Sequence, residues 1–123
     1  MKMENPLEPA GRAALAASRE MLALEPEEKA QALRLMAAGV RNAAEKIIRE
    51  NVLDMEEARK SGRNSAFLDR LLLTPDRVEH MACGIEQVAA LPDPVGECIR
   101  EWTRPNGLRI RQVRVPLGVI GFI

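Results

Sequence analysis

Residues 111–123 read RQVRVPLGVIGFI, and the stretch 115–123 contains no charged or polar side chain. At the end of a soluble chain, a strand of this kind would leave apolar surface and unpaired backbone groups facing water. An apolar run without alternation is instead typical of a strand that is covered on both faces, as in the parallel sheet of an α/β domain. We therefore expect 117–123 to be an interior strand of a longer protein, with its neighbours encoded beyond Ile123.

The charges of the chain balance, with 18 basic and 18 acidic residues and a formal net charge of zero. Without a net field, binding to nucleic acid or to an anionic membrane surface is not expected. No apolar run approaches the roughly 18 residues of a membrane span, and the N-terminal residues MKMENPLEP lack the apolar stretch of a signal peptide. The sequence therefore predicts a cytoplasmic protein without nucleic-acid or membrane partners.

Upstream of Pro92, apolar residues recur three and four positions apart, which predicts helices that each bury one face. One helix is expected from about Pro9, and a second is expected from Pro26 through about Arg49, with Arg41 on its solvated face. Asn51 and Asp54 then suggest a helix break with a local cap, although a polar site is the alternative. Three shorter helices are then expected. The first ends at Gly62, the second spans 64–73, and the third starts at Thr74 with Pro75 in its first turn. The expected buried stripes are Leu33, Met36, Val40, Ala44, Ile47 and Ile48 in the second helix and Val78, Met81, Ile85 and Val88 in the last.

After Pro94 the pattern changes to two short runs, ECIREWT and LRIRQVRV, on either side of RPNG. Asn-Gly between two such runs predicts a β-hairpin, with Pro105 in a type I turn and Gly107 at a positive φ. The second run changes parity between Ile110 and Val113, so we expect either a bulge or a change of the covered face near Gln112.

Few side chains suggest chemistry by themselves. Cys83 and Cys98 lack metal-ligand spacing, and inert packing is the preferred interpretation over a reactive thiol. His80, the single histidine, is expected on an exposed helix surface. Gly118 and Gly121 are too few for a dinucleotide fingerprint, so close approach of a neighbouring backbone is preferred. No catalytic or metal-binding residue is predicted in this chain.

Several motifs together resemble γ-glutamyl phosphate reductase, a family of the aldehyde dehydrogenase superfamily. They are, in order, IIRENVLDMEEARKSG, AFLDRLLLTPDRV, LPDPVGE, PNGLRI and VRVPLGVIGFI. The resemblance runs from about Leu33 to Ile123 and covers only the N-terminal portion of the family. It implies an α/β fold class: N-terminal helices over 1–92, a β-hairpin arm over 93–116, and over 117–123 the first strand of an incomplete aldehyde-dehydrogenase-like, NADP-binding domain.

The resemblance implies an enzyme that reduces L-glutamate 5-phosphate with NADPH to L-glutamate 5-semialdehyde and phosphate, in proline biosynthesis. In the family, a cysteine thiolate attacks the acyl phosphate and expels phosphate, and hydride transfer then reduces the thioester. That cysteine lies far downstream, in a motif which this chain does not reach. The asparagine that helps to form the family's oxyanion hole lies just beyond Ile123, in the loop that follows the strand. This chain alone is therefore expected to be inactive, and only the backbone of Phe122 and Ile123 is expected to contact the cofactor.

Five arginines crowd the hairpin. A solvated strand face is the simplest explanation of this crowding. Arginine on a strand also discourages the edge of the sheet from pairing with another strand. The superfamily suggests an alternative, an arm that joins subunits, so a homo-oligomer is expected for the full-length enzyme. The five arginines are Arg100, Arg104, Arg109, Arg111 and Arg114.

A different class of function also stays open, namely a helical interaction module that adds its C-terminal strand to a partner's sheet.

Overall fold

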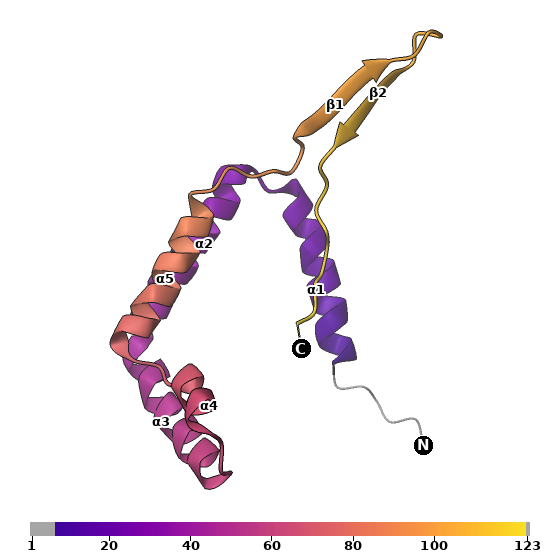
Figure 1. Ribbon diagram of the computed structural model, residues 1–123. Coiled ribbons are helices and arrows are strands. Elements are labelled where there is room, and N and C mark those ends of the chain that lie inside the picture. Colours follow the sequence, from indigo (N-terminus) through magenta and orange to yellow (C-terminus); the bar gives the residue numbers. More distant parts are fainter. Residues whose placement is uncertain (1–6, 123) are drawn as a thin grey trace, which may run out of the picture. The chain divides into compact units, whose positions relative to one another are not determined.

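The computed structural model describes residues 7–122, which form two compact units. One unit, Glu27–Leu91, is helical; the other combines the segments before and after it, up to Pro26 and from Pro92. The chain is mostly helical with one antiparallel two-stranded hairpin, as the sequence predicts (Figure 1). None of the described helices is both long and apolar enough to cross a membrane. The elements are α1 (Glu8–Glu20), the 3-10 turn η1 (Met21–Ala23), α2 (Pro26–Asn42), α3 (Ala44–Lys60), α4 (Ser65–Leu71), α5 (Pro75–Ala89), β1 (Cys98–Thr103) and β2 (Arg109–Val113).

The helix expected from Pro26 to about Arg49 is two helices, α2 and α3, separated at Ala43. The backbone of Ala43 bends to φ −93° and ψ 2°, while the amide of Ala43 still donates to Gly39 O at 3.0 Å. Alanine is the strongest helix former, so neither propensity nor the apolar pattern signals a bend at this position. The predicted break at Asn51 is wrong, because α3 continues unbroken to Lys60.

Local caps end and begin the remaining helices of this unit where the sequence places them. Gly62 has a φ of +68° after α3, and Gly62 N and Arg63 N donate to Arg59 O and Ala58 O in a Schellman arrangement. The side chain of Asn64 accepts from the amide of Phe67 at 2.9 Å, and that of Thr74 accepts from Arg77 N at 3.2 Å. These caps satisfy helix-end groups that would otherwise lack partners.

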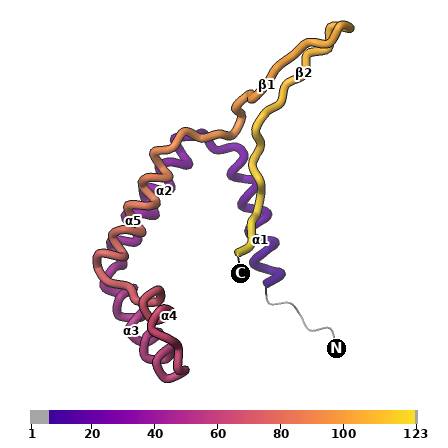
Figure 2. Tube along the Cα trace, in the orientation of Figure 1, coloured from indigo at the N-terminus to yellow at the C-terminus, as the bar shows by residue number. Residues whose placement is uncertain are grey.

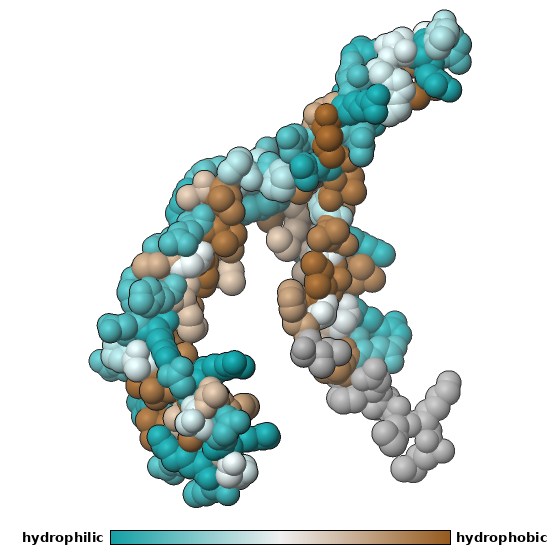
Figure 3. Space-filling model, viewed as in Figure 1, coloured by the Kyte–Doolittle hydropathy of each residue, from teal (hydrophilic) through white to brown (hydrophobic). Residues whose placement is uncertain are grey.

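The core of the helical unit consists mainly of small side chains. On α5 the buried residues are Val78, Ala82 and Ala89, whereas Met81 and Val88, which the sequence analysis placed in the stripe, are 43% and 54% exposed. The buried face is therefore rotated towards the alanines, which let helices approach closely. Hydrophobic residues also lie on the molecular surface (Figure 3). The buried apolar residues are Ala37, Met55, Ala58, Val78, Ala82 and Ala89.

One polar side chain, Asn51, is buried in this core and is 5% exposed. Its Nδ2 donates to Leu71 O at 2.9 Å, and its Oδ1 accepts from Leu73 N at 2.8 Å. One end of the amide is therefore satisfied by the last residue of α4, and the other end by the connection between α4 and α5. Asn51 does not cap a break in α3 and is not a solvent-facing polar site; it ties the end of α4 and the following connection to the middle of α3.

The hairpin of the other unit has the expected turn and a bulge. Gly107 N donates to Arg104 O at 2.9 Å, and Gly107 has a φ of +84°, as predicted. Arg100 pairs with Gln112 and Cys98 with Val113, so the register shifts by one residue on β1, at Ile99. The bulge therefore lies opposite the predicted position, on the partner strand.

After β2 the chain leaves the sheet, and the strand expected over 117–123 is not formed in the described part, 117–122. A strand needs a neighbour for its backbone hydrogen bonds, and no described segment pairs with these residues. Gly118 adopts a φ of +90°, which is outside the extended region, and an added Cβ would meet nothing within 4 Å. The positive φ, and not a close neighbour, is what requires glycine at 118 in this structure. Figure 2 shows the trace running on from the hairpin towards the C-terminal end.

Candidate functional site

The predicted cofactor contacts lie at the end of the described chain. Phe122 is 94% exposed, and Ile123 lies outside the described residues. The segment 115–122 carries no polar side chain, so it offers a ligand only backbone groups and apolar contacts. A dinucleotide also needs groups that bind its phosphates. The described residues of this segment therefore contain at most one edge of a cofactor site.

The most strongly coupled charges lie between α2 and α5, around Arg41. Its guanidinium donates to Glu79, with Nη2–Oε1 at 2.8 Å, and to Glu86, with Nη2–Oε2 at 2.9 Å. The two carboxylates are seven residues apart on α5, which places them on one helix face, two turns apart. The planar donor fork of arginine suits two carboxylates at once. Arg41 is one-third exposed, so its side chain is partly solvated, and it also pairs across helices, which the sequence pattern does not predict.

These contacts set the protonation of both acids. Hydrogen bonding to Arg41 lowers the pKa of Glu79 from 4.5 to about 2, and it also lowers the pKa of Glu86. The same hydrogen bonds raise the pKa of Arg41, which stays charged. A group that exchanges protons in catalysis needs a pKa near the working pH. The cluster therefore acts as an ionic tie between two helices and not as an acid–base site.

Cys83 borders this cluster but is held as a thiol. Its Sγ donates to Glu79 Oε1 at 3.3 Å, and Arg41 Nη2 lies 3.7 Å away. Hydrogen bonding to Glu79, with some desolvation, raises the pKa of Cys83. A catalytic cysteine needs the opposite shift, because the thiolate is the nucleophile. The geometry thus agrees with inert packing for Cys83, while Cys98 is exposed on β1 and His80 is exposed on α5.

The arginines of the hairpin are largely paired within it. Arg109 lies 2.6 Å from Glu101, and Arg111, directly opposite Glu101 in the ladder, lies 3.9 Å from the same carboxylate. Arg114 lies 2.8 Å from Glu97. The guanidinium of Arg100 stacks over the Trp102 ring, 5.1 Å from its centroid. Exposed cross-strand pairs of this kind are the expected features of a solvated strand face.

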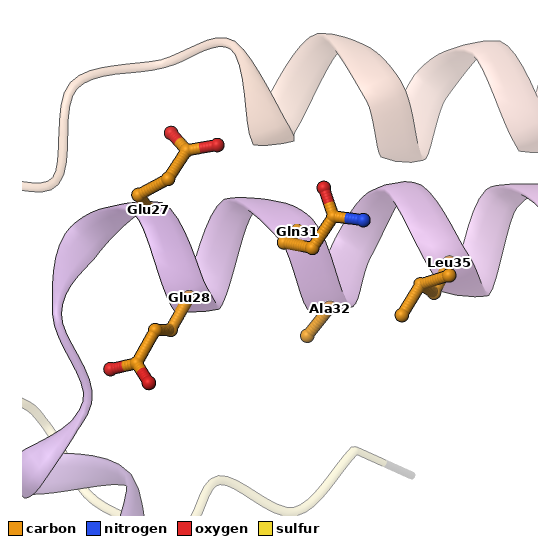
Figure 4. Close-up of a pocket in the computed structure, with 5 residues that line it drawn as sticks. All are labelled: Glu27, Glu28, Gln31, Ala32 and Leu35. Atoms are coloured by element: carbon orange, nitrogen blue, oxygen red, sulfur yellow. The ribbon is translucent and has the colours of Figure 1, made fainter.

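A hollow on the helical unit does not have the form of a built ligand site. A hollow of about 440 Å³ lies along the first turns of α2, lined by Glu27, Glu28, Gln31, Ala32 and Leu35. Its walls come from one helix, and Glu27 and Glu28 point to different sides of it (Figure 4). A ligand site normally needs polar groups that converge from several elements. Within 7–122, no three His, Cys, Asp or Glu side chains are grouped to hold a metal ion.

Comparison with known proteins identifies related sequences, although no family model matches the chain. The chain is 52% identical over 113 residues to γ-glutamyl phosphate reductase of Rhodopseudomonas palustris, which covers 92% of this chain and 26% of the relative. It is 51% identical over 107 residues to the enzyme of that name from Geobacillus kaustophilus, again with 26% of the relative covered. The chain thus spans about a quarter of the length of the relatives it matches.

Solved structures give the same result for the fold. The crystal structure of γ-glutamyl phosphate reductase from Thermotoga maritima matches with a TM-score of 0.85 and 34% identity, over 91% of this chain and 27% of that one. The enzyme from Saccharomyces cerevisiae matches with a TM-score of 0.80 and 27% identity, over 90% and 28%. The resemblance stated from the sequence motifs is therefore confirmed: this chain is similar, in sequence and in fold, to the N-terminal portion of γ-glutamyl phosphate reductase.

Proposed function

We propose that the chain is the N-terminal part of a longer, cytoplasmic NADPH-dependent reductase. This enzyme converts L-glutamate 5-phosphate to L-glutamate 5-semialdehyde and phosphate, a step of proline biosynthesis. The observation that carries the proposal is the extent of the match, because 52% identity extends over 92% of the chain and not over an isolated motif. A fold match with a TM-score of 0.85 over a similar share of the chain also supports it.

Within such an enzyme, the three parts of the chain would have different roles. Residues 1–92 would supply helical cover, 93–116 the hairpin arm, and 117–123 the first strand of the NADP-binding domain. The exposure of the last part supports this division, since Leu117 is 88% and Val119 50% exposed. Full burial of one such side chain stabilises a fold by about 1.5–3 kcal/mol. Covering this segment would therefore stabilise the longer protein substantially.

The cofactor would supply the hydride, and this chain would supply only a wall of its site, through the backbone of Phe122 and Ile123. Neither Cys83 nor Cys98 matches the motif of the family's nucleophile, and Cys83 is in addition held as a thiol by its hydrogen bond to Glu79. The catalytic cysteine is therefore expected in the remainder of the enzyme. The chain of 123 residues should then be inactive by itself.

An activity assay tests the proposal. The longer protein encoded by the same reading frame should oxidise NADPH only when L-glutamate 5-phosphate is present, and it should release phosphate. The assay is repeated with NADH to determine the cofactor preference, and with the 123-residue chain as the inactive control. A pure, folded longer protein without glutamyl-phosphate-dependent NADPH oxidation would refute the proposed reaction.

The hairpin is proposed to act as an oligomerisation arm of a homo-oligomeric enzyme. Its strands form a two-stranded sheet whose outer edges have no partner among the described residues, and isolated hairpins are marginally stable in water. Deleting the tip, 104–107, from the longer protein should lower its native mass. An unchanged mass by light scattering would reject the arm.

A second function stays open because 115–122 is exposed and apolar. The chain would then be a helical interaction module, without enzymatic activity, that adds this segment as a strand to a partner's sheet edge. The reading frame separates the two functions. Continuation into a reductase of about four times this length favours the enzyme, whereas a stop codon after Ile123 in the intact gene favours the module.

A further inference from the structure

We draw no further inference here: the strongest candidate, the arginine-rich hairpin formed by β1 and β2 with its unpaired outer edges, restates a property of the superfamily when a further strand or subunit is placed against it, and nothing in the structure shows what else covers it.

Discussion

Replacing Asn51 with alanine should lower the free energy of unfolding of the helical unit, because a buried side chain that makes two hydrogen bonds is removed. The amide of Asn51 makes two hydrogen bonds, to Leu71 O at 2.9 Å and from Leu73 N at 2.8 Å, at a side chain that is 5% exposed. Each contributes about 1 kcal/mol net, and a backbone group left without a partner costs about 1–3 kcal/mol. Because water can reach Leu71 and Leu73 in part, we expect a total loss of about 2–3 kcal/mol.

The assay is reversible urea unfolding followed by circular dichroism, with Glu56→Ala as the matched control. Glu56 is exposed on the same helix, so its loss should change the free energy of unfolding by no more than about 0.5 kcal/mol. Hydrogen exchange provides a local measurement, since the Leu73 amide should lose protection in Asn51→Ala and keep it in the control. If Asn51→Ala unfolds at the same urea concentration as Glu56→Ala, the proposed tie between α3 and the α4–α5 connection is wrong.

Three further predictions concern the caps, the ionic tie and the thiols. Gly62→Ala should destabilise the helical unit by about 1 kcal/mol, because Gly62 has a φ of +68°. Gly39→Ala, inside α2, should stabilise the unit by about 0.5–1 kcal/mol. A change of the same sign for both variants in thermal unfolding would contradict this. The folded pKa of Glu79 is depressed from 4.5 to about 2, so its stabilising effect is complete above about pH 4.5 and is lost as the pH falls towards 2. Glu79→Gln should therefore flatten the acid limb of a stability–pH curve, and an unchanged limb would exclude the tie. The two thiols are compared with an aromatic disulfide reagent at pH 8. Cys98→Ser, which keeps Cys83, should react more slowly than Cys83→Ser, which keeps Cys98, because the pKa of Cys83 is raised. The reverse order would disprove the protected thiol.

Local signals predicted the ends of elements well. The Thr74–Pro75 start of α5, the glycine at 62 and the turn around Gly107 are each determined by a few neighbouring residues, and the structure contains all three. Their physics is local, because caps and positive φ values depend on short stretches of backbone.

Long-range features could not be predicted in the same way. Arg41 pairs with acids about forty positions along the chain, and Asn51 bonds to a connection twenty positions away. A polar residue within a helical pattern suggests either solvent or a cap, and only the fold shows which backbone groups it meets. The bend at Ala43 contains no glycine or proline that would predict it. On α5, the hydrophobic pattern favours the large residues Met81 and Val88, whereas the buried face contains alanines. In the proposed enzyme, the catalytic cysteine is expected outside this chain, so the sequence of this chain could not predict the site.

The central claim concerns the apolar segment at the end of the chain. In 7–122 it has no neighbour in a sheet and is exposed at Leu117 and Phe122, whereas the proposed enzyme needs it as an interior strand. The most direct test is hydrogen exchange of the amides in 117–122, measured in the 123-residue chain and in the longer protein under identical conditions. The account predicts rapid exchange in the shorter chain and strong protection in the longer protein. Equally rapid exchange in both would contradict it.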